Sequence, residues 1–194
     1  GTPLFDLGRN LFNIFNQNND IRRWAFVDPT SLVSTTYATD ANYVSTDVLV
    51  IDKYPGKGNT PLRNDVKIFR LSEMYLILAE AAAAQDKLVD AATYIKKIRD
   101  ARTYSGTATL PVYANKVDAL KDVLKERRVE LCLEGHRYVD LRRLGEVAGV
   151  SIDRNKVDDV VSSTPLTLDI KDHRFTFPIP QNEKLGNPSI VQNP

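Results

Sequence analysis

Hydrophobic and polar positions alternate with a helical period through the middle of the chain, residues 66–145. Near its start, apolar residues recur three or four positions apart, which predicts one apolar helix face: Leu71, Tyr75, Leu78 and Ala82. Five alanines within residues 79–84 add helix propensity and allow a partner helix to approach closely. We therefore expect a helix that packs tightly against a neighbour.

A second amphipathic helix is expected after a polar break at residues 85–87. Its apolar face comprises Leu88, Ala91, Ala92, Ile95 and Ile98. Two such helices joined by a few residues form an antiparallel hairpin, which is the unit of a tetratricopeptide-type solenoid. No second copy at the same period is visible in the sequence, so we predict one hairpin.

Two further helices are predicted after a loop. The first spans residues 116–133 and is closed by Gly135, because glycine accepts the left-handed backbone that a helix end needs. Its inner stripe consists of Val117, Leu120, Leu124 and Leu131. The second is shorter, spans residues 136–144 and ends at Gly145.

The two flanking segments lack helical periodicity. Residues 1–65 are rich in Asn and aromatic residues and predict an irregular segment, unable to fold alone, with a short strand at residues 47–51. Residues 146–194 predict a strand within 169–177 and an extended tail that wraps over the body, because its prolines disfavour helix. The predicted fold is mainly α, with a tetratricopeptide-like hairpin, further helices, irregular loops and a wrapping tail.

Composition and charge exclude several functions. The chain has 194 residues and a formal charge of +1, and its basic residues are interleaved with acidic ones, which argues against nucleic-acid binding. No apolar run reaches the length of a membrane span. The single cysteine, Cys132, excludes an internal disulfide and is expected to be a core residue. Because the glycines at 56–58 lack the spacing of a phosphate loop, we also expect no cofactor.

The densest cluster of charged residues lies within residues 126–143. Glu126, Glu130 and Glu134 are four positions apart and share one helix face. A helix-borne metal site needs Glu-x-x-His pairs, which these residues lack, and a glycosidase needs two carboxyl groups across a cleft. We therefore expect neither a metal nor catalysis, but a lattice of arginine–carboxylate pairs that joins the two last helices.

Aromatic side chains in the first segment are the candidate ligand contacts. Trp24, Tyr37, Tyr43 and Tyr54 lie in loop-like sequence, where flat rings can stack on the apolar faces of sugars. The alternative is that the rings fill the seam between this segment and the helices. We take Trp24, Tyr37 and Tyr43 as the predicted stacking surface.

Three stretches resemble the SusD/RagB family, in the family's own order. The first covers residues 70–81 and includes Arg70 and Glu73, and the last covers 177–194 with its Phe-Pro-Ile-Pro motif. The central stretch matches the family signature at Glu126, Arg127, Arg128, Glu130, Glu134, Arg137, Asp140 and Arg143. The resemblance implies that these residues form the family's structural framework, whereas its sugar contacts come from variable loops.

The resemblance also implies a location and a partner. Members are helical lipoproteins on the outer face of the outer membrane in Gram-negative bacteria, and they bind glycans or other nutrients without cleaving them. Each acts as a lid over a SusC-like TonB-dependent transporter. Members are usually much longer, so we expect this chain to be a C-terminal region, held at the membrane only through a lipid anchor that it does not itself carry.

The sequence thus predicts non-catalytic capture of an oligosaccharide or polysaccharide for import. The alternative is a tetratricopeptide-type scaffold that binds a protein and no sugar. An exposed aromatic cluster with polar neighbours favours capture, whereas an apolar groove of peptide width along the helices favours the scaffold.

Overall fold

The computed structural model describes residues 6–17, 19–36, 47–56, 63–158 and 165–193, and it is mainly α as predicted. Its α-helices are α1 (Arg9–Phe15), α2 (Arg22–Phe26), α4 (Leu71–Ala84), α5 (Leu88–Arg102), α6 (Lys116–Glu130), α7 (His136–Asp140), α8 (Glu146–Ala148) and α9 (Gln181–Gly186). A π-turn, η1 (Leu141–Gly145), and two 3₁₀ turns, η2 (Lys156–Asp158) and η3 (His173–Phe175), complete the helical structure. Two antiparallel strands, β1 (Ile152–Asp153) and β2 (Thr167–Leu168), form a small sheet.

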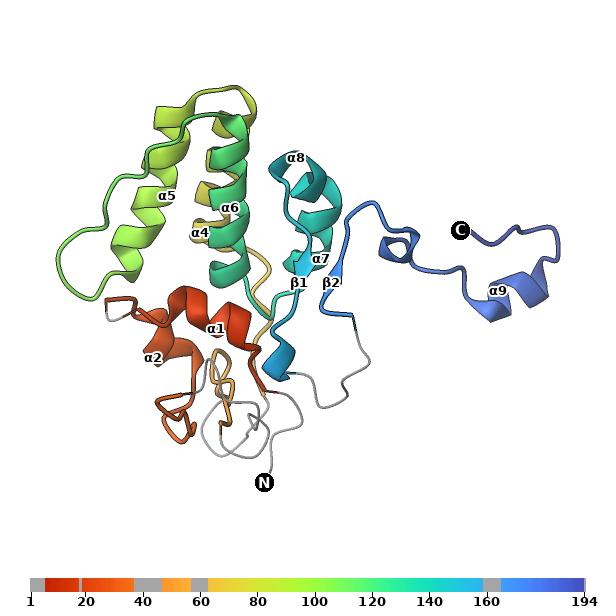
Figure 1. Cartoon of the computed structure of the whole chain (residues 1–194), viewed down its shortest axis with the longest axis horizontal. Coiled ribbons are helices and arrows are strands. Elements are labelled where there is room, and N and C mark those ends of the chain that lie inside the picture. The colour runs from red at the N-terminus through yellow and green to blue at the C-terminus, as the bar shows by residue number, and fades with distance from the viewer. Residues whose placement is uncertain (1–5, 18, 37–46, 57–62, 159–164, 194) are drawn as a thin grey trace.

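Helices α4, α5 and α6 lie side by side and form the body of the molecule (Figure 1). Helices α4 and α5 are joined by a short turn at residues 85–87, which confirms the predicted hairpin. Small side chains fill the core between the helices, including Ala82, Ala83, Ala91 and Ala119. These alanines bring the backbones close together, as the sequence predicted. Across the described ranges, no helix is both long and apolar enough to cross a bilayer.

The buried face of α4 matches the predicted one only in part: Ala82 is buried, but the two predicted leucines are exposed. Leu71 is 71% exposed and Leu78 is 45% exposed, whereas Leu76 and Ala79 are fully buried. Nearly every position of this helix after Tyr75 is apolar, so spacing alone did not select a face. In α5 the prediction was correct, because most of its predicted face is buried: Ala91, Ala92, Ile95 and Ile98.

The chain turns between α6 and α7 in residues 131–135, where Gly135 has a φ of 82° as its predicted left-handed role requires. The prediction that the next helix ends at Gly145 is wrong. The helical run continues through η1 to α8 and ends before Gly149, whose φ is 63°. A Cβ at Gly145 would lie 2.7 Å from the Val150 carbonyl oxygen, so glycine here permits the returning chain to approach.

The N-terminal segment is more regular than predicted. It contains α1 and α2, and Phe12 and Phe15 are buried in a cluster that includes a valine of α6. The predicted strand at residues 47–51 is wrong, since this segment makes only isolated bridges to Leu32 and Val27. The aromatic residues of α1 thus pack against the C-terminal end of α6.

The C-terminal segment departs from both predictions made for it. The turn η3 occupies part of the predicted strand at 169–177, because the Asp172 side chain caps it by accepting from the Arg174 amide. Phe175 is buried and stacks on Tyr138, with ring centroids 5.9 Å apart. Beyond this anchor the chain leads away from the helices rather than wrapping over them, and α9 lies near its far end (Figure 1) without a buried residue.

Candidate functional site

Glu130 of α6 lies at the centre of the charged cluster, with a fully buried side chain. Arg102 donates two hydrogen bonds to its carboxylate, at 2.6 and 3.0 Å, and Arg70 donates one at 2.8 Å. Arg22 approaches to 3.5 Å. Burial raises the pKa of Glu130, but the hydrogen bonds and charges of the arginines, Arg102 foremost, outweigh it and lower this pKa to about 2. The charged carboxylate therefore ties three distant segments to α6.

Further ion pairs extend this cluster along α6. Glu126 accepts from Arg22 at 2.7 Å and from Arg99 at 2.8 Å. Glu134 accepts from Lys53, which belongs to the N-terminal segment. Most partners of these carboxylates thus come from α2, α5 and the segments before α4, not from the following helix as predicted.

A smaller set of pairs joins α6 to the next helix. Arg127 donates to Asp140 at 2.7 Å, and Arg143 donates to the same carboxylate at 2.8 Å. Arg143 also donates to Glu80 of α4 at 2.7 Å. These bonds provide the predicted link between the two helices and connect it to the hairpin.

Three signature residues stand apart from these pairs. Arg128 binds Asp153 of β1 at 3.0 Å, and a Glu73 oxygen lies 3.9 Å from His136 Nδ1. Arg137 makes no hydrogen bond or ion pair with any residue in the described ranges, so the predicted carboxylate partner is missing here. Among those same ranges, no three His, Cys, Asp or Glu side chains converge as metal ligands.

Trp24, the first predicted stacking residue, lies on α2 with 68% of its surface exposed. The Arg23 guanidinium sits 5.0 Å from the indole centroid, within the range of a cation–π contact. Beside the ring is a cavity of about 190 Å³, whose wall includes Phe12 and Val27 with the polar Asp28. Tyr37 and Tyr43, the other two predicted residues, lie outside the described residues.

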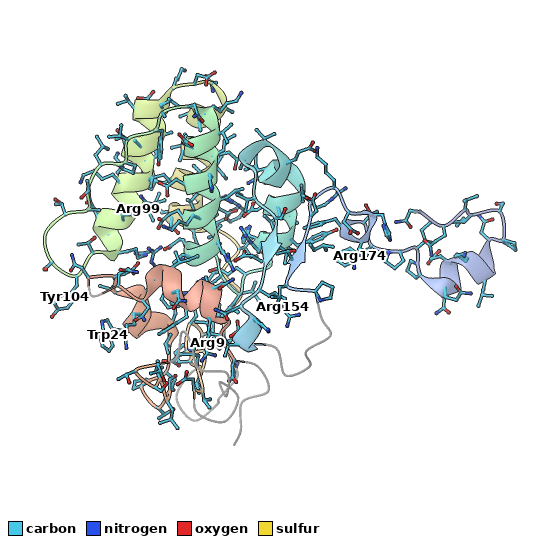
Figure 2. The ribbon with its side chains drawn as sticks, viewed as in Figure 1. Arg9, Trp24, Arg99, Tyr104, Arg154 and Arg174 are labelled. Carbon is cyan, nitrogen blue, oxygen red and sulfur yellow. The ribbon has the colours of Figure 1, made fainter. Side chains whose placement is uncertain are left out.

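Tyr104 is an exposed aromatic residue that the sequence did not single out. It is 79% exposed and follows α5, where its amide donates to the Asn19 carbonyl at 2.9 Å and Thr103 bridges Asp20. Figure 2 shows Tyr104 and Trp24 at the same outer edge of the molecule. The only sequence signal for Tyr104 was its place in a Ser- and Gly-containing loop.

Tyr54 has a different environment from Trp24. It is half-buried, and burial together with the hydrogen bond that its hydroxyl donates to Glu134 raises the pKa of this hydroxyl to about 12. The Lys53 ammonium lies 5.8 Å from the centroid of this ring and 4.7 Å from that of Phe26. Tyr54 therefore fills the seam between the N-terminal segment and the helices, which is the alternative that the sequence left open for the rings.

Comparison with known proteins places this architecture in a family. Residues 23–194 match the sequence profile described as the SusD family. This chain belongs to the SusD family. A curated relative, SusD-like protein P38 from Formosa agariphila, is 36% identical over 153 residues, which cover 75% of this chain and 28% of the relative. The SusD-family chain thus spans little more than a quarter of that relative's length.

Solved structures share the fold of this SusD-family chain. A SusD superfamily protein from Bacteroides fragilis superimposes with a TM-score of 0.70 at 22% identity, covering 100% of this chain and 41% of its own. Surface glycan-binding protein A from Bacteroides uniformis gives 0.61 at 25% identity, with coverage of 97% and 40%. The arrangement of helices described above is therefore a SusD arrangement.

Proposed function

We propose that this SusD-family chain forms part of a surface that binds glycans, or another nutrient, without cleaving them. The observation that carries the proposal is the exposed indole ring of Trp24, with the Arg23 guanidinium and a small, partly apolar cavity beside it. A flat exposed ring offers a stacking face for a pyranose, and neighbouring polar groups can bond its hydroxyls. The likeness to surface glycan-binding protein A, at 25% identity, supports the same function.

Within this proposal, Trp24 acts together with Tyr37 and Tyr43, as the sequence predicted, and with Tyr104. The Tyr104 backbone is hydrogen-bonded to the segment that leads into α2, so its ring is held near the Trp24 side of the molecule. The two rings of Trp24 and Tyr104 at one edge favour a chain of sugars over a single one, because each ring can stack on one residue of the chain.

The proposed setting is the surface of a Gram-negative outer membrane. The captured glycan is handed to a SusC-like TonB-dependent transporter, and a lipid anchor holds the longer protein to the membrane. Family membership supports this setting, because the match covers residues 23–194. The charged residues centred on Glu130 serve as the framework that holds α2, and with it Trp24, against the helical body.

A protein-interaction scaffold is the second candidate. The face of α4 that points away from the core exposes Leu71, Met74, Ile77 and Leu78, and such apolar helix faces commonly bind other helices. Glycan capture has the stronger support, because Trp24 is combined with polar neighbours and the glycan-binding relative shares this fold.

The test compares Trp24→Ala with Phe69→Ala, which removes an exposed ring of similar size from another segment. Both variants and the parent protein are titrated by calorimetry with a panel of soluble neutral and acidic polysaccharides. We expect Trp24→Ala to weaken binding of one glycan about tenfold or more, since central aromatic contacts dominate binding energy, and Phe69→Ala to have no effect. Equal affinities for all three proteins would contradict the proposal.

A further inference from the structure

A second cavity, of about 390 Å³, lies between α6, the start of α7 and β1. Four basic residues line it: Lys121, Lys125, Arg128 and Arg137. Its volume falls within the range of roughly 300–1,000 Å³ that is typical of small-molecule sites. It is about twice as large as the cavity beside Trp24. Helices α6 and α7 and strand β1 are neighbours in Figure 1.

Arg137 is the unusual member of this lining. It is half-buried, yet no side chain or carbonyl in the described part of the chain accepts a hydrogen bond from it. Burial, and then the charge of Arg128, lower the pKa of the Arg137 guanidinium to about 10. These two effects outweigh the charges of Asp153 and Asp140, which raise this pKa. A partly desolvated cation without a hydrogen-bonded partner is unfavourable, and an anion that accepts from it would relieve that cost.

The carboxylates in the wall are already engaged. Asp153 accepts from Arg128 at 3.0 Å and from Asn10 at 2.7 Å. Asp122 accepts from Arg99 at 2.7 Å and from Tyr113 at 2.8 Å. Neither aspartate accepts a hydrogen bond from Lys121, Lys125 or Arg137.

The remaining charges leave the cavity positive. Lys121 and Lys125, like Arg137, have no ion-pair partner among the described residues, and Asp118, exposed on the first turn of α6, is the lining carboxylate that forms no ion pair with them or with any other described residue. Residues 121, 125 and 128 follow each other at four and three positions, so they share one face of α6. The lining thus carries four basic side chains against three carboxylates, two of which are already hydrogen-bonded.

The same cavity has an apolar wall. Ile14 of α1, Leu124 of α6 and Val150 after α8 complete the lining. A ligand that fits this combination has an anionic group for the basic side and a compact, partly apolar body for the other. A sugar ring with an acidic substituent has both properties.

We propose that this cavity binds the carboxylate or sulfate group of an acidic saccharide, with Arg137 as the main anion contact. The planar guanidinium can donate two parallel hydrogen bonds to such a group, while Lys121 and Lys125 add positive charge at the mouth. This inference rests on the proposed function, because it names the class of glycan that the same protein captures. It assigns binding to a signature residue that the family resemblance treats as framework.

The experiment titrates the protein by calorimetry, at low salt, with glucuronic acid, glucose 6-sulfate and glucose. We expect at least one of the acids to bind and glucose not to bind at the same concentrations. Binding of glucuronic acid alone identifies a carboxylate site, and binding of the sulfate alone identifies a sulfate site. Added salt should weaken binding of either acid, because Lys121 and Lys125 are exposed.

Two variants and one control locate the site. Arg137→Gln should weaken binding of the acid about tenfold or more, and Lys121→Gln/Lys125→Gln should weaken it severalfold. The control, Lys87→Gln/Arg142→Gln, removes two exposed charges that do not line the cavity, and it should bind like the parent protein. Because the two lysines are exposed, the double variant remains informative even if Arg137→Gln fails to fold.

The outcomes separate this inference from the proposed function. If neither acid binds more tightly than glucose, or if the cavity variants and the control bind equally well, the inference is wrong. Binding of a neutral glycan that depends on Trp24 would still support the proposed function in that case. If an acid binds and Arg137→Gln weakens that binding, while Trp24→Ala changes the affinity for no glycan, the anion site is supported and the stacking surface is contradicted.

Discussion

Replacing Glu130 with glutamine tests the physical basis of the helical framework. The substitution keeps the shape of the side chain but removes the buried negative charge that faces Arg22, Arg70 and Arg102. A folded-state pKa of about 2, against an ordinary value of 4.5, corresponds to about 3 kcal/mol of stability at neutral pH. Breaking a buried ion pair on one side costs a similar amount, about 3–5 kcal/mol.

The effect of Glu130→Gln should depend on pH in a defined direction. The folded-state pKa of Glu130 is lowered, so its contribution is complete above about pH 5 and is lost as the pH falls through 4.5 toward 2. At pH 3 the contribution has fallen to about 1 kcal/mol by the same relation. The difference between parent and variant should therefore shrink by more than half between pH 7 and pH 3.

The assay is urea unfolding of the parent, Glu130→Gln and Glu183→Gln at pH 7 and pH 3. Glu183 is an exposed glutamate on α9, so its replacement should change stability by less than about 0.5 kcal/mol at either pH. A Glu130→Gln effect below about 1 kcal/mol at pH 7, or one that is unchanged at pH 3, would refute the reasoning. The charged framework would then contribute no net stability.

Three further substitutions or reactions test the local structure. Gly145→Ala should destabilise the protein by about 1–3 kcal/mol in thermal unfolding, because the new Cβ would lie 2.7 Å from a backbone oxygen. The control Gly186→Ala, with open space around the new Cβ, should leave the unfolding temperature unchanged. Asn115→Ala should cost about 1 kcal/mol in urea unfolding, since its side chain caps α6 by accepting from the Asp118 amide. Cys132 should react with a thiol reagent only after urea unfolding, because burial raises its thiol pKa; fast labelling of the folded protein would show that this site is open.

Helical periodicity predicted the hairpin but not all of its packing. In α5 polar residues occupy the positions between the apolar ones and mark the outer face. Spacing alone therefore identified the buried Ala91, Ile95 and Ile98. In α4 the run of alanines leaves few polar positions to mark the outer face, and the core selects the small Ala79 over the large Leu78. Which residue of α4 is buried depends on how closely α5 and α6 approach it. The sequence pattern of α4 alone carries no information about that distance.

The charged cluster shows the same limit for long-range contacts. The spacing of Glu126, Glu130 and Glu134 placed them on one face, and arginine pairing followed from their chemistry. The actual partners of Glu130 lie 28 to 108 positions away along the chain, in α2, in α5 and before α4. Their identity is a property of the tertiary fold. The same reason explains why Tyr104 was missed as a neighbour of the α2 segment.

The most direct test of glycan capture is the fluorescence of Trp24, the single tryptophan of the chain. Because its ring is 68% exposed, its emission reports on ligand contact at one known place. We expect a saturable shift in emission when the protein is titrated with the polysaccharide that it binds in calorimetry. Binding of that polysaccharide with no change in Trp24 emission would contradict the assignment of this ring to the ligand surface.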